Sequence, residues 1–245
     1  MPPRRPTLPL ALVLRSVLHR TRIIDLSVGA FLGLVGLAIA LYRGGTWWDR
    51  SHRGYSFLEN FLCDLLHHRT LGGHPNLVNA RLALMGMLTL AIGIITAFSL
   101  APELIPARRQ LGRSIAWFGG ISTGVMAAAP VLRSDAYPRL HSIAVVGGSV
   151  PTLFAFAILV GALLLEPAVT RAFRAVSLSL LVLAVAQLAL YAWDVFFGGP
   201  SLRLLPGLEH VASVLLIVWL LMVARLVRYR LITAYLALVR AKSKK

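Results

Sequence analysis

Long apolar runs separated by short charged connections dominate the pattern of this chain. Six of these runs contain no Asp, Glu, Lys, Arg or His. A bilayer core about 30 Å thick needs about 20 consecutive apolar residues for one helical span, a length that most of the runs approach. The pattern therefore predicts an all-α, polytopic membrane protein with six transmembrane helices. Their expected ranges are 26–42, 82–101, 114–132, 142–165, 175–193 and 211–224.

Basic residues predict the orientation of these spans. The chain has 25 Lys and Arg against 9 Asp and Glu, a formal net charge of +16. In a soluble protein this excess would indicate nucleic acid, but 58% of the residues are hydrophobic and only 14% are charged. Membrane proteins collect Lys and Arg in their cytoplasmic connections, and 17 of the 25 fall on the side of the two termini. We therefore expect cytoplasmic termini and no nucleic-acid partner.

One membrane domain, residues 26–228, accounts for almost the whole chain. The flanking segments 1–25 and 229–245 mix apolar residues with Arg and Lys. We expect them to be basic amphipathic segments that lie on an anionic cytoplasmic leaflet. Cys63 is the only cysteine, so no disulfide can form within the chain.

The first outer connection, residues 43–81, is much longer than the others. Loops of this length usually carry function or structure of their own. Residues 55–68 have apolar positions at the helical period and are too few to span a bilayer, which predicts an interfacial amphipathic helix. Its polar face would comprise Glu59, Asn60, Cys63, Asp64, His67 and His68. Three aromatic residues are expected beside it at the depth of the lipid headgroups: Trp47, Trp48 and Tyr55.

Glycines and the absence of charge describe the interior of the spans. Gly29 and Gly33, and likewise Gly120 and Gly124, have the four-residue spacing that allows helices to approach closely. Proton-coupled transporters usually hold an ionisable group at mid-depth, and these spans have none. The pattern therefore favours helix packing over ion-coupled transport.

Polar residues with metal-binding chemistry gather on the predicted outer side. Imidazole and carboxylate groups are ligands of Zn²⁺, and an open position would hold a water nucleophile. The candidate ligands are His141, His210 and Asp64, and the candidate catalytic carboxylates are Asp64, Asp194 and Glu59. Alternatively, the outer carboxylates pair with arginines and tie helix ends together. That alternative involves Asp64, Asp135, Asp194 and Glu209 with Arg81, Arg133 and Arg139.

Three stretches resemble a known family: YSFLENFLCDL, HPNLVNARLALMG and APVLRSDAYPRLHSIAVVGG. The chain from residue 26 to about residue 228 resembles the bacterial membrane proteins of the domain-of-unknown-function 998 family, which are distantly similar to the Frag/DRAM/Sfk group. This resemblance implies a six-span architecture, a location in the bacterial inner (plasma) membrane and no defined reaction. The matching positions are Ser56, Pro75, Asn76, Asp135 and His141.

The ceramidase-like zinc hydrolases offer a second comparison. Ser56, Asp64, His141 and His210 are similar to the serine, aspartate and histidines around their metal. Those enzymes have seven spans and paired histidines in the last one, whereas this chain has six predicted spans and a single histidine there. The zinc-hydrolase mechanism is therefore a minority hypothesis.

Three functions are compatible with this pattern. Charge-free spans and amphipathic segments favour a protein that binds a lipid or a partner protein at its outer face. The outer His and Asp residues allow a metal-dependent membrane hydrolase that acts on lipid, with zinc as its cofactor. A chain without an independent motif also fits a structural subunit of a larger membrane complex. The expected partners are membrane lipids and other membrane protein subunits.

Overall fold

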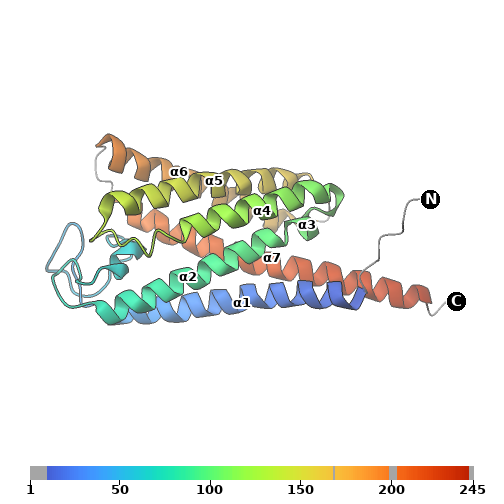
Figure 1. Cartoon of the computed structure of the whole chain (residues 1–245), viewed down its shortest axis with the longest axis horizontal. Helices are drawn as coiled ribbons and strands as arrows, with labels where there is room; N and C mark the ends of the chain where they lie inside the picture. The colour runs from blue at the N-terminus through green and yellow to red at the C-terminus, as the bar shows by residue number, and fades with distance from the viewer. Residues whose placement is uncertain (1–9, 168, 199–202, 243–245) are drawn as a thin grey trace.

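Six long helices run side by side with alternating direction, and their connections lie at the two ends of the bundle (Figure 1). The computed structural model describes residues 10–167, 169–198 and 203–242, with the side chains of 14–167, 169–198 and 203–236. The long helices are α1 (Leu10–Leu41), α2 (Leu77–Ser99), α4 (Arg109–Met126), α5 (Pro138–Leu164), α6 (Arg171–Phe197) and α7 (Leu205–Lys242). The short elements are the 3-10 helices η1 (Leu62–Leu66) and η2 (Pro106–Arg108) and the helix α3 (Ala101–Leu104).

The helices that the apolar runs predict are present. In the described part of the chain, α1, α2, α5, α6 and α7 are long and apolar enough to cross a membrane. This finding confirms the prediction of an all-α membrane protein. α4 has 18 residues, among them Arg109 and Arg113, and is not one of these five.

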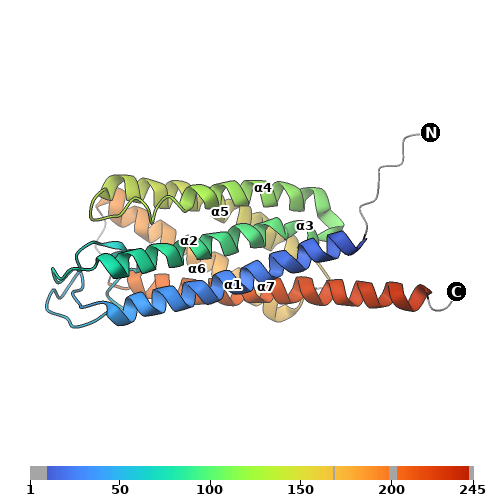
Figure 2. The same ribbon diagram turned by 60° about the horizontal axis from the view of Figure 1, so that its bottom comes forward.

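The chain termini lie at one end of the bundle and the two long connections at the other (Figure 2). α1 begins and α7 ends at the same end, which we call the terminal end; α3 and η2 also lie there. The connections of residues 42–76 and 127–137 lie at the opposite end, which we call the loop end. Each long helix therefore leads from one end to the other.

Two helices are much longer than the apolar runs alone indicate. α1 already begins at Leu10, and α7 continues to Lys242. Arg and Lys are good helix formers, so basic residues outside the apolar stretch do not end the helix. Most of the predicted basic segments 1–25 and 229–245 is therefore continuous with α1 and α7. Residues 1–9 and 243–245 of these segments lie outside the described residues.

The prediction of one amphipathic helix over residues 55–68 is wrong. This stretch contains turns and the five-residue η1. Its polar and apolar faces are also mixed, because Asn60 and Asp64 are fully buried together with Leu65 and Leu66, whereas Leu58 is 71% exposed. Asn60 Oδ1 accepts a hydrogen bond from the backbone N–H four residues earlier, at 3.0 Å, and Asp64 Oδ2 from that three residues earlier, at 2.8 Å. Such side-chain bonds to the backbone compete with a regular helix.

Close helix contacts involve glycines other than the predicted ones. Around the Cβ position, open space surrounds Gly29, Gly33 and Gly124, and the nearest atom to Gly120 is 3.9 Å away. A Cβ added to Gly119 would lie 2.5 Å from the ring of Phe98 in α2. A Cβ added to Gly148 would lie 2.5 Å from the backbone of Met126 in α4. Small residues therefore do allow helices to approach, but α4 turns Gly119 toward its neighbour instead of Gly120 and Gly124.

Candidate functional site

The connection between α1 and α2, residues 42–76, folds into a cap over the loop end of the bundle (Figure 1). Gly44 and Gly45 have φ angles of 121° and 91°, in a region that favours glycine because a Cβ is disfavoured there. A Cβ on Gly45 would also collide with the backbone of Gly72. The beginning of the cap is joined to its later part at this point, because Gly72 N donates a hydrogen bond to Gly44 O at 3.2 Å.

Asp64 of η1 is the central hydrogen-bond acceptor of the cap. Three groups donate to its buried carboxylate: Phe61 N at 2.8 Å, Trp47 Nε1 at 3.1 Å and Asn60 Nδ2 at 3.4 Å. Burial raises the pKa of Asp64 from its ordinary 3.8 to about 6, although these hydrogen bonds lower it in part. Both carboxylate oxygens are thus occupied by neutral donors of the cap itself, so Asp64 serves as a structural group.

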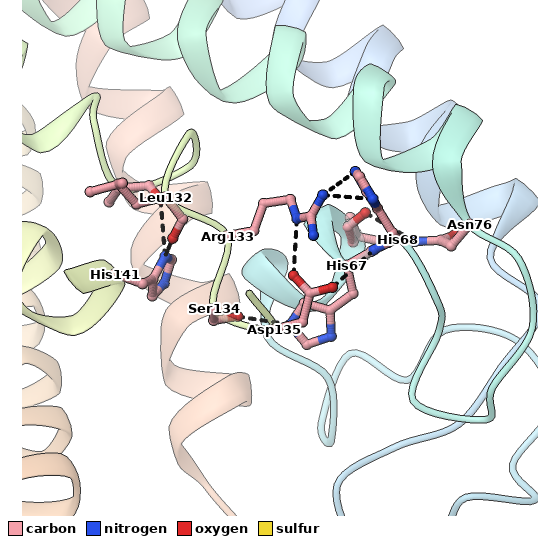
Figure 3. Close-up of polar contacts among 10 residues, drawn as sticks. His67, His68, Asn76, Leu132, Arg133, Ser134, Asp135 and His141 are labelled. Carbon is pink, nitrogen blue, oxygen red and sulfur yellow. Dashed lines mark hydrogen bonds and ion pairs between the residues drawn. The ribbon is translucent and has the colours of Figure 1, made fainter. Parts of the chain in front are cut away.

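The connection between α4 and α5 docks against the cap (Figure 3). Arg133 Nε donates to Asp135 Oδ1 at 3.0 Å, and its guanidinium contacts the ring of His68. Among the outer carboxylates and arginines expected to pair, all of which the structure describes, this is the one ion pair that forms. His68 N donates to Asp135 Oδ2 at 3.2 Å. Beside them, His67 Nε2 lies 2.7 Å from Ser134 Oγ, and burial lowers the pKa of His67. These contacts join two connections that are distant in the sequence.

α7 binds the underside of the cap through Glu209 and His210. Glu209 Oε2 accepts a hydrogen bond from Leu62 N at 3.0 Å. His210 Nδ1 lies 2.6 Å from Pro206 O, and because a carbonyl only accepts, Nδ1 carries the proton. His210 Nε2 then accepts from the hydroxyl of Tyr55 at 2.9 Å. Both ring nitrogens of His210 are therefore used within the chain.

A cavity of about 380 Å³ lies inside the bundle below the cap. All six long helices and η1 contribute residues to its wall. Most of the wall is apolar, and the ring of Trp219 closes part of it by packing edge-on against Phe156 with 5.1 Å between centroids. The indole nitrogen of Trp219 donates to Ser177 Oγ at 3.0 Å. This part of the cavity thus presents hydrocarbon and aromatic carbon to any occupant.

Polar side chains gather toward the cap end of the cavity. The principal ones are Cys63, His141, Gln187, Tyr191, Glu209 and Ser213. Glu209 is the only acidic residue in the described wall, which contains no Lys or Arg. The cavity therefore combines a long apolar part with a small polar end that carries one carboxylate.

His141 belongs to this polar end, in the first turn of α5. Its ring is buried, and Nδ1 lies 2.9 Å from both Ala129 O and Leu132 O (Figure 3). Carbonyl oxygens only accept hydrogen bonds, so the proton is on Nδ1. In the neutral ring, Nε2 is then a hydrogen-bond acceptor.

The three predicted zinc ligands have separate environments. His141 lines the cavity, whereas His210 is bonded to Tyr55 and Asp64 lies within the cap. In the described residues, no group of three or more His, Cys, Asp and Glu is arranged to hold a metal ion. The zinc site and the hydrolase reaction therefore stay predictions without geometric support.

The other predicted catalytic carboxylates also lie away from the cavity wall. Glu59 accepts a hydrogen bond from Thr46 Oγ1 at 2.9 Å and closes a turn of the cap. Asp194 is half-buried near the end of α6. Neither residue shares a wall with His141, so the structure does not bring together the predicted acid and base.

The predicted aromatic residues divide between the surface and the interior of the cap. Trp47 is 48% exposed, and the guanidinium of Arg50 lies 5.6 Å from its ring centroid. Trp48 is half-buried, with Arg203 5.8 Å from its ring. Tyr55 instead packs inside the cap, where burial raises the pKa of its hydroxyl. Of these three residues, the two tryptophans therefore reach the surface of the cap, whereas Tyr55 does not contribute to it in the same way.

The roles of Glu209, Gln187 and Tyr191 in a cavity wall do not follow from motif reasoning. One sequence signal does point to them: Gln187 is the sole amide within the apolar runs, and Tyr191 follows four residues later on the same helical face. Glu209 is the acidic residue at the start of the last run. Polar residues on one face of an apolar helix thus marked the cavity.

Comparisons with known proteins identify no relative of this chain. No protein-family model, no curated protein and no solved structure matches it. The resemblance to the domain-of-unknown-function 998 family therefore stays a prediction, and the fold and cavity carry the functional argument alone.

Proposed function

We propose that the protein crosses a bacterial inner membrane six times, with its termini in the cytoplasm, and binds one lipid-like amphiphile inside the helix bundle. The observation that carries this proposal is the cavity, whose wall is mostly apolar along the bundle and has its acidic residue and its histidine, Glu209 and His141, under the cap. Ligand sites of proteins are typically concave, about 300–1,000 Å³ in volume, and mostly apolar with a few placed polar groups. The cavity has these properties.

Chain connectivity supports the sixth span. α2 ends at the terminal end of the bundle and α5 begins at the loop end, so the chain must return between them. α4 makes this return beside α2 and α5, and Arg109 and Arg113 lie in the half that is nearer the terminal end. Basic residues near one end of a span are typical of the cytoplasmic side. We therefore infer that α4 crosses with the other five helices.

The ligand's orientation follows from the distribution of polarity. Its hydrocarbon would occupy the part of the cavity near Phe156 and Trp219, because that wall removes apolar surface from water. Its polar group would lie beside His141 and Glu209, which are the wall residues able to form strong hydrogen bonds. The cap would then cover the polar group from the outer side.

Two alanines in α6 provide a matched test of this function. Ala184 lines the cavity, whereas Ala186 is exposed on the outside of the bundle. We expect Ala184→Trp to fill the cavity and lower the amount of co-purifying lipid at least tenfold, while Ala186→Trp leaves it unchanged. Native mass spectrometry of the three detergent-purified proteins measures the bound lipid. Equal lipid occupancy in wild type and Ala184→Trp would overturn the proposal, provided that both elute as the same monodisperse species.

Labelling of introduced cysteines tests the topology. In a Cys63→Ser background, Arg69→Cys places a thiol on the cap and Arg108→Cys places one at the terminal end. In intact cells we expect an impermeant maleimide to label only Arg69→Cys. Labelling of Arg108→Cys instead would reverse the orientation, and labelling of both would exclude an α2 that crosses the membrane.

A further inference from the structure

We propose that the polar end of the cavity selects an amphiphile whose head donates hydrogen bonds and carries no negative charge, such as a long-chain alcohol or amine. This inference rests on the proposed function and names the chemistry of its ligand. Three wall residues carry it, because each presents a hydrogen-bond acceptor to the cavity, and those that have a proton donate it within the chain. They are Glu209, His141 and Tyr191.

Glu209 presents a carboxylate oxygen without a partner. Oε2 accepts from Leu62 N at 3.0 Å, whereas no described residue donates to Oε1. The wall that we can describe has no Lys or Arg to neutralise the charge. A buried carboxylate needs hydrogen bonds or a counter-charge. A ligand head that donates a hydrogen bond to Oε1 would therefore stabilise Glu209.

His141 presents a second acceptor. Nδ1 donates to the carbonyls of Ala129 and Leu132, both at 2.9 Å, which leaves Nε2 as the free nitrogen. The ring lies in the first turn of α5. In the neutral ring Nε2 has a lone pair and no proton.

Tyr191 presents a third acceptor through a chain of hydroxyls. Ser142 Oγ donates its single proton to Pro138 O at 3.0 Å. The hydroxyl of Tyr191, 3.2 Å from Ser142 Oγ, must therefore donate to it. The oxygen lone pairs of Tyr191 are left for the cavity.

These three residues discriminate between polar head groups by the charge of the head and by its ability to donate a hydrogen bond. A hydroxyl or ammonium head would donate to acceptors that otherwise stay unpaired, and such bonds to charged groups are strong. A carboxylate or phosphate head would bring a second negative charge beside Glu209 without a cation in the described wall. For amphiphiles with unbranched chains of equal length, the order of binding affinities should therefore depend on the head group.

Three brominated C16 probes with equal chains test this order: the alcohol, the amine and the fatty acid. Bromine quenches the fluorescence of Trp219 in the cavity wall, and the Trp219→Phe variant gives the quenching of the other tryptophans. With the full chain in detergent, we expect the alcohol or the amine, or both, to bind about tenfold more tightly than the acid, which corresponds to one strong hydrogen bond. Whichever of the alcohol and the amine binds more tightly then shows whether the preferred head group is neutral or cationic.

Two variants sharpen the test. Glu209→Gln removes the charge but keeps an oxygen for Leu62 N, and we expect it to reduce the preference over the acid to less than about threefold. Tyr191→Phe removes one acceptor and should weaken binding of the preferred probe by about threefold. Binding of the acid as tightly as the alcohol and amine, with quenching that Ala184→Trp abolishes, would overturn this inference alone. Quenching that Ala184→Trp does not change for any probe would overturn the proposed function.

Discussion

The two ends of the bundle compensate buried and half-buried carboxylates in opposite ways. At the terminal end, arginines face them: Arg20 Nη2 lies 3.2 Å from Glu103 Oε1, and Arg228 Nη2 lies 2.8 Å from Asp25 Oδ2. At the loop end, Asp64 and Glu209 are bonded to neutral N–H groups instead. Counter-charges leave no net field, whereas neutral donors stabilise a carboxylate without cancelling its charge. At the loop end, Glu209 has no Lys or Arg beside it in the described cavity wall.

Removing the central acceptor of the loop end should have the largest effect. Asp64→Ala leaves Trp47 Nε1 and Phe61 N without their acceptor, whereas Asn60 Nδ2 keeps its bond to Gly45 O. We expect the free energy of unfolding to fall by about 4 kcal/mol, because each unsatisfied buried donor costs about 1–3 kcal/mol. Asp194→Ala, which removes a half-buried carboxylate outside the cap, is the control. The free energy of unfolding is measured by titration with SDS in mixed micelles. Similar decreases in both variants would contradict the view that Asp64 is the central acceptor of the cap.

The pH dependence of stability should also come from the loop end. The raised pKa of Asp64, about 6 against an ordinary 3.8, means that the folded state binds this proton more tightly than the unfolded state. The stabilisation of the folded state by this proton on Asp64 is therefore complete below pH 3.8 and is lost as the pH rises through 6. Between pH 7.5 and 4.5, wild type should gain about 2 kcal/mol relative to Asp64→Asn.

The comparison with Asp64→Asn separates this effect from that of His67. Burial lowers the pKa of His67, so its contribution is lost as the pH falls and has the opposite sign. Both proteins contain His67, and its effect cancels in the difference between their unfolding free energies. A difference that does not change with pH would show that Asp64 titrates like an exposed carboxyl.

At the terminal end, Arg230 should contribute less than Asp64. Its Nη1 donates to Glu103 O at 3.1 Å and Leu104 O at 2.8 Å, the last carbonyls of α3. Arg230→Met should lower the free energy of unfolding by about 2 kcal/mol, because these bonds come from a charged donor. Arg225→Met, on the exposed side of α7, should change it little. An effect of Arg230→Met larger than that of Asp64→Ala would reverse the comparison of the two ends.

The smallest effect is expected where the second connection docks on the cap. Arg133 and Asp135 form an ion pair whose side chains are 26% and 29% exposed, and such pairs contribute about 0.5 kcal/mol. Arg133→Ala should lower the unfolding free energy by that amount in low salt and by less in high salt. The matched variant Arg139→Ala concerns an exposed arginine in α5. A loss above about 2 kcal/mol for Arg133→Ala would make this ion pair part of the buried network.

The membrane helices could be predicted because their signal is long and local. A run of about 20 apolar residues has few alternatives to a helix when no water is present to bind the backbone. The helix ends could not be found in this way, since α1 and α7 continue through basic residues that are themselves good helix formers. Length and apolarity thus define the part of a helix in lipid and not its full extent.

The cap could not be predicted, because its polar side chains act on its own backbone. Helical periodicity assigned Asn60 and Asp64 to an exposed face, but both are buried as partners of backbone N–H groups and of Trp47. Whether an Asn or Asp bonds to a local N–H or to water depends on the path of residues 42–76 as a whole. That path depends in turn on the two glycines at positive φ, Gly44 and Gly45.

The cavity was only partly accessible to sequence reasoning. His141 was singled out as a candidate and does line the cavity. Its expected partners were His210 and Asp64, whereas the structure provides Glu209 and Tyr191 in the wall. Which side of a helix faces inward depends on the packing of all six helices, and residues one position apart, such as Glu209 and His210, can differ completely in environment.

The length of α7 has a mechanical consequence. Its 38 residues correspond to roughly 57 Å of helix, about twice the hydrocarbon thickness of a bilayer. After Gly207 the helix contains no further Gly or Pro, so it has no built-in hinge. Glu209 beside the cavity and Arg230 at α3 belong to this one rod. A tilt or axial slip imposed at either end is therefore transmitted to the other, on the opposite side of the membrane, without any connecting loop.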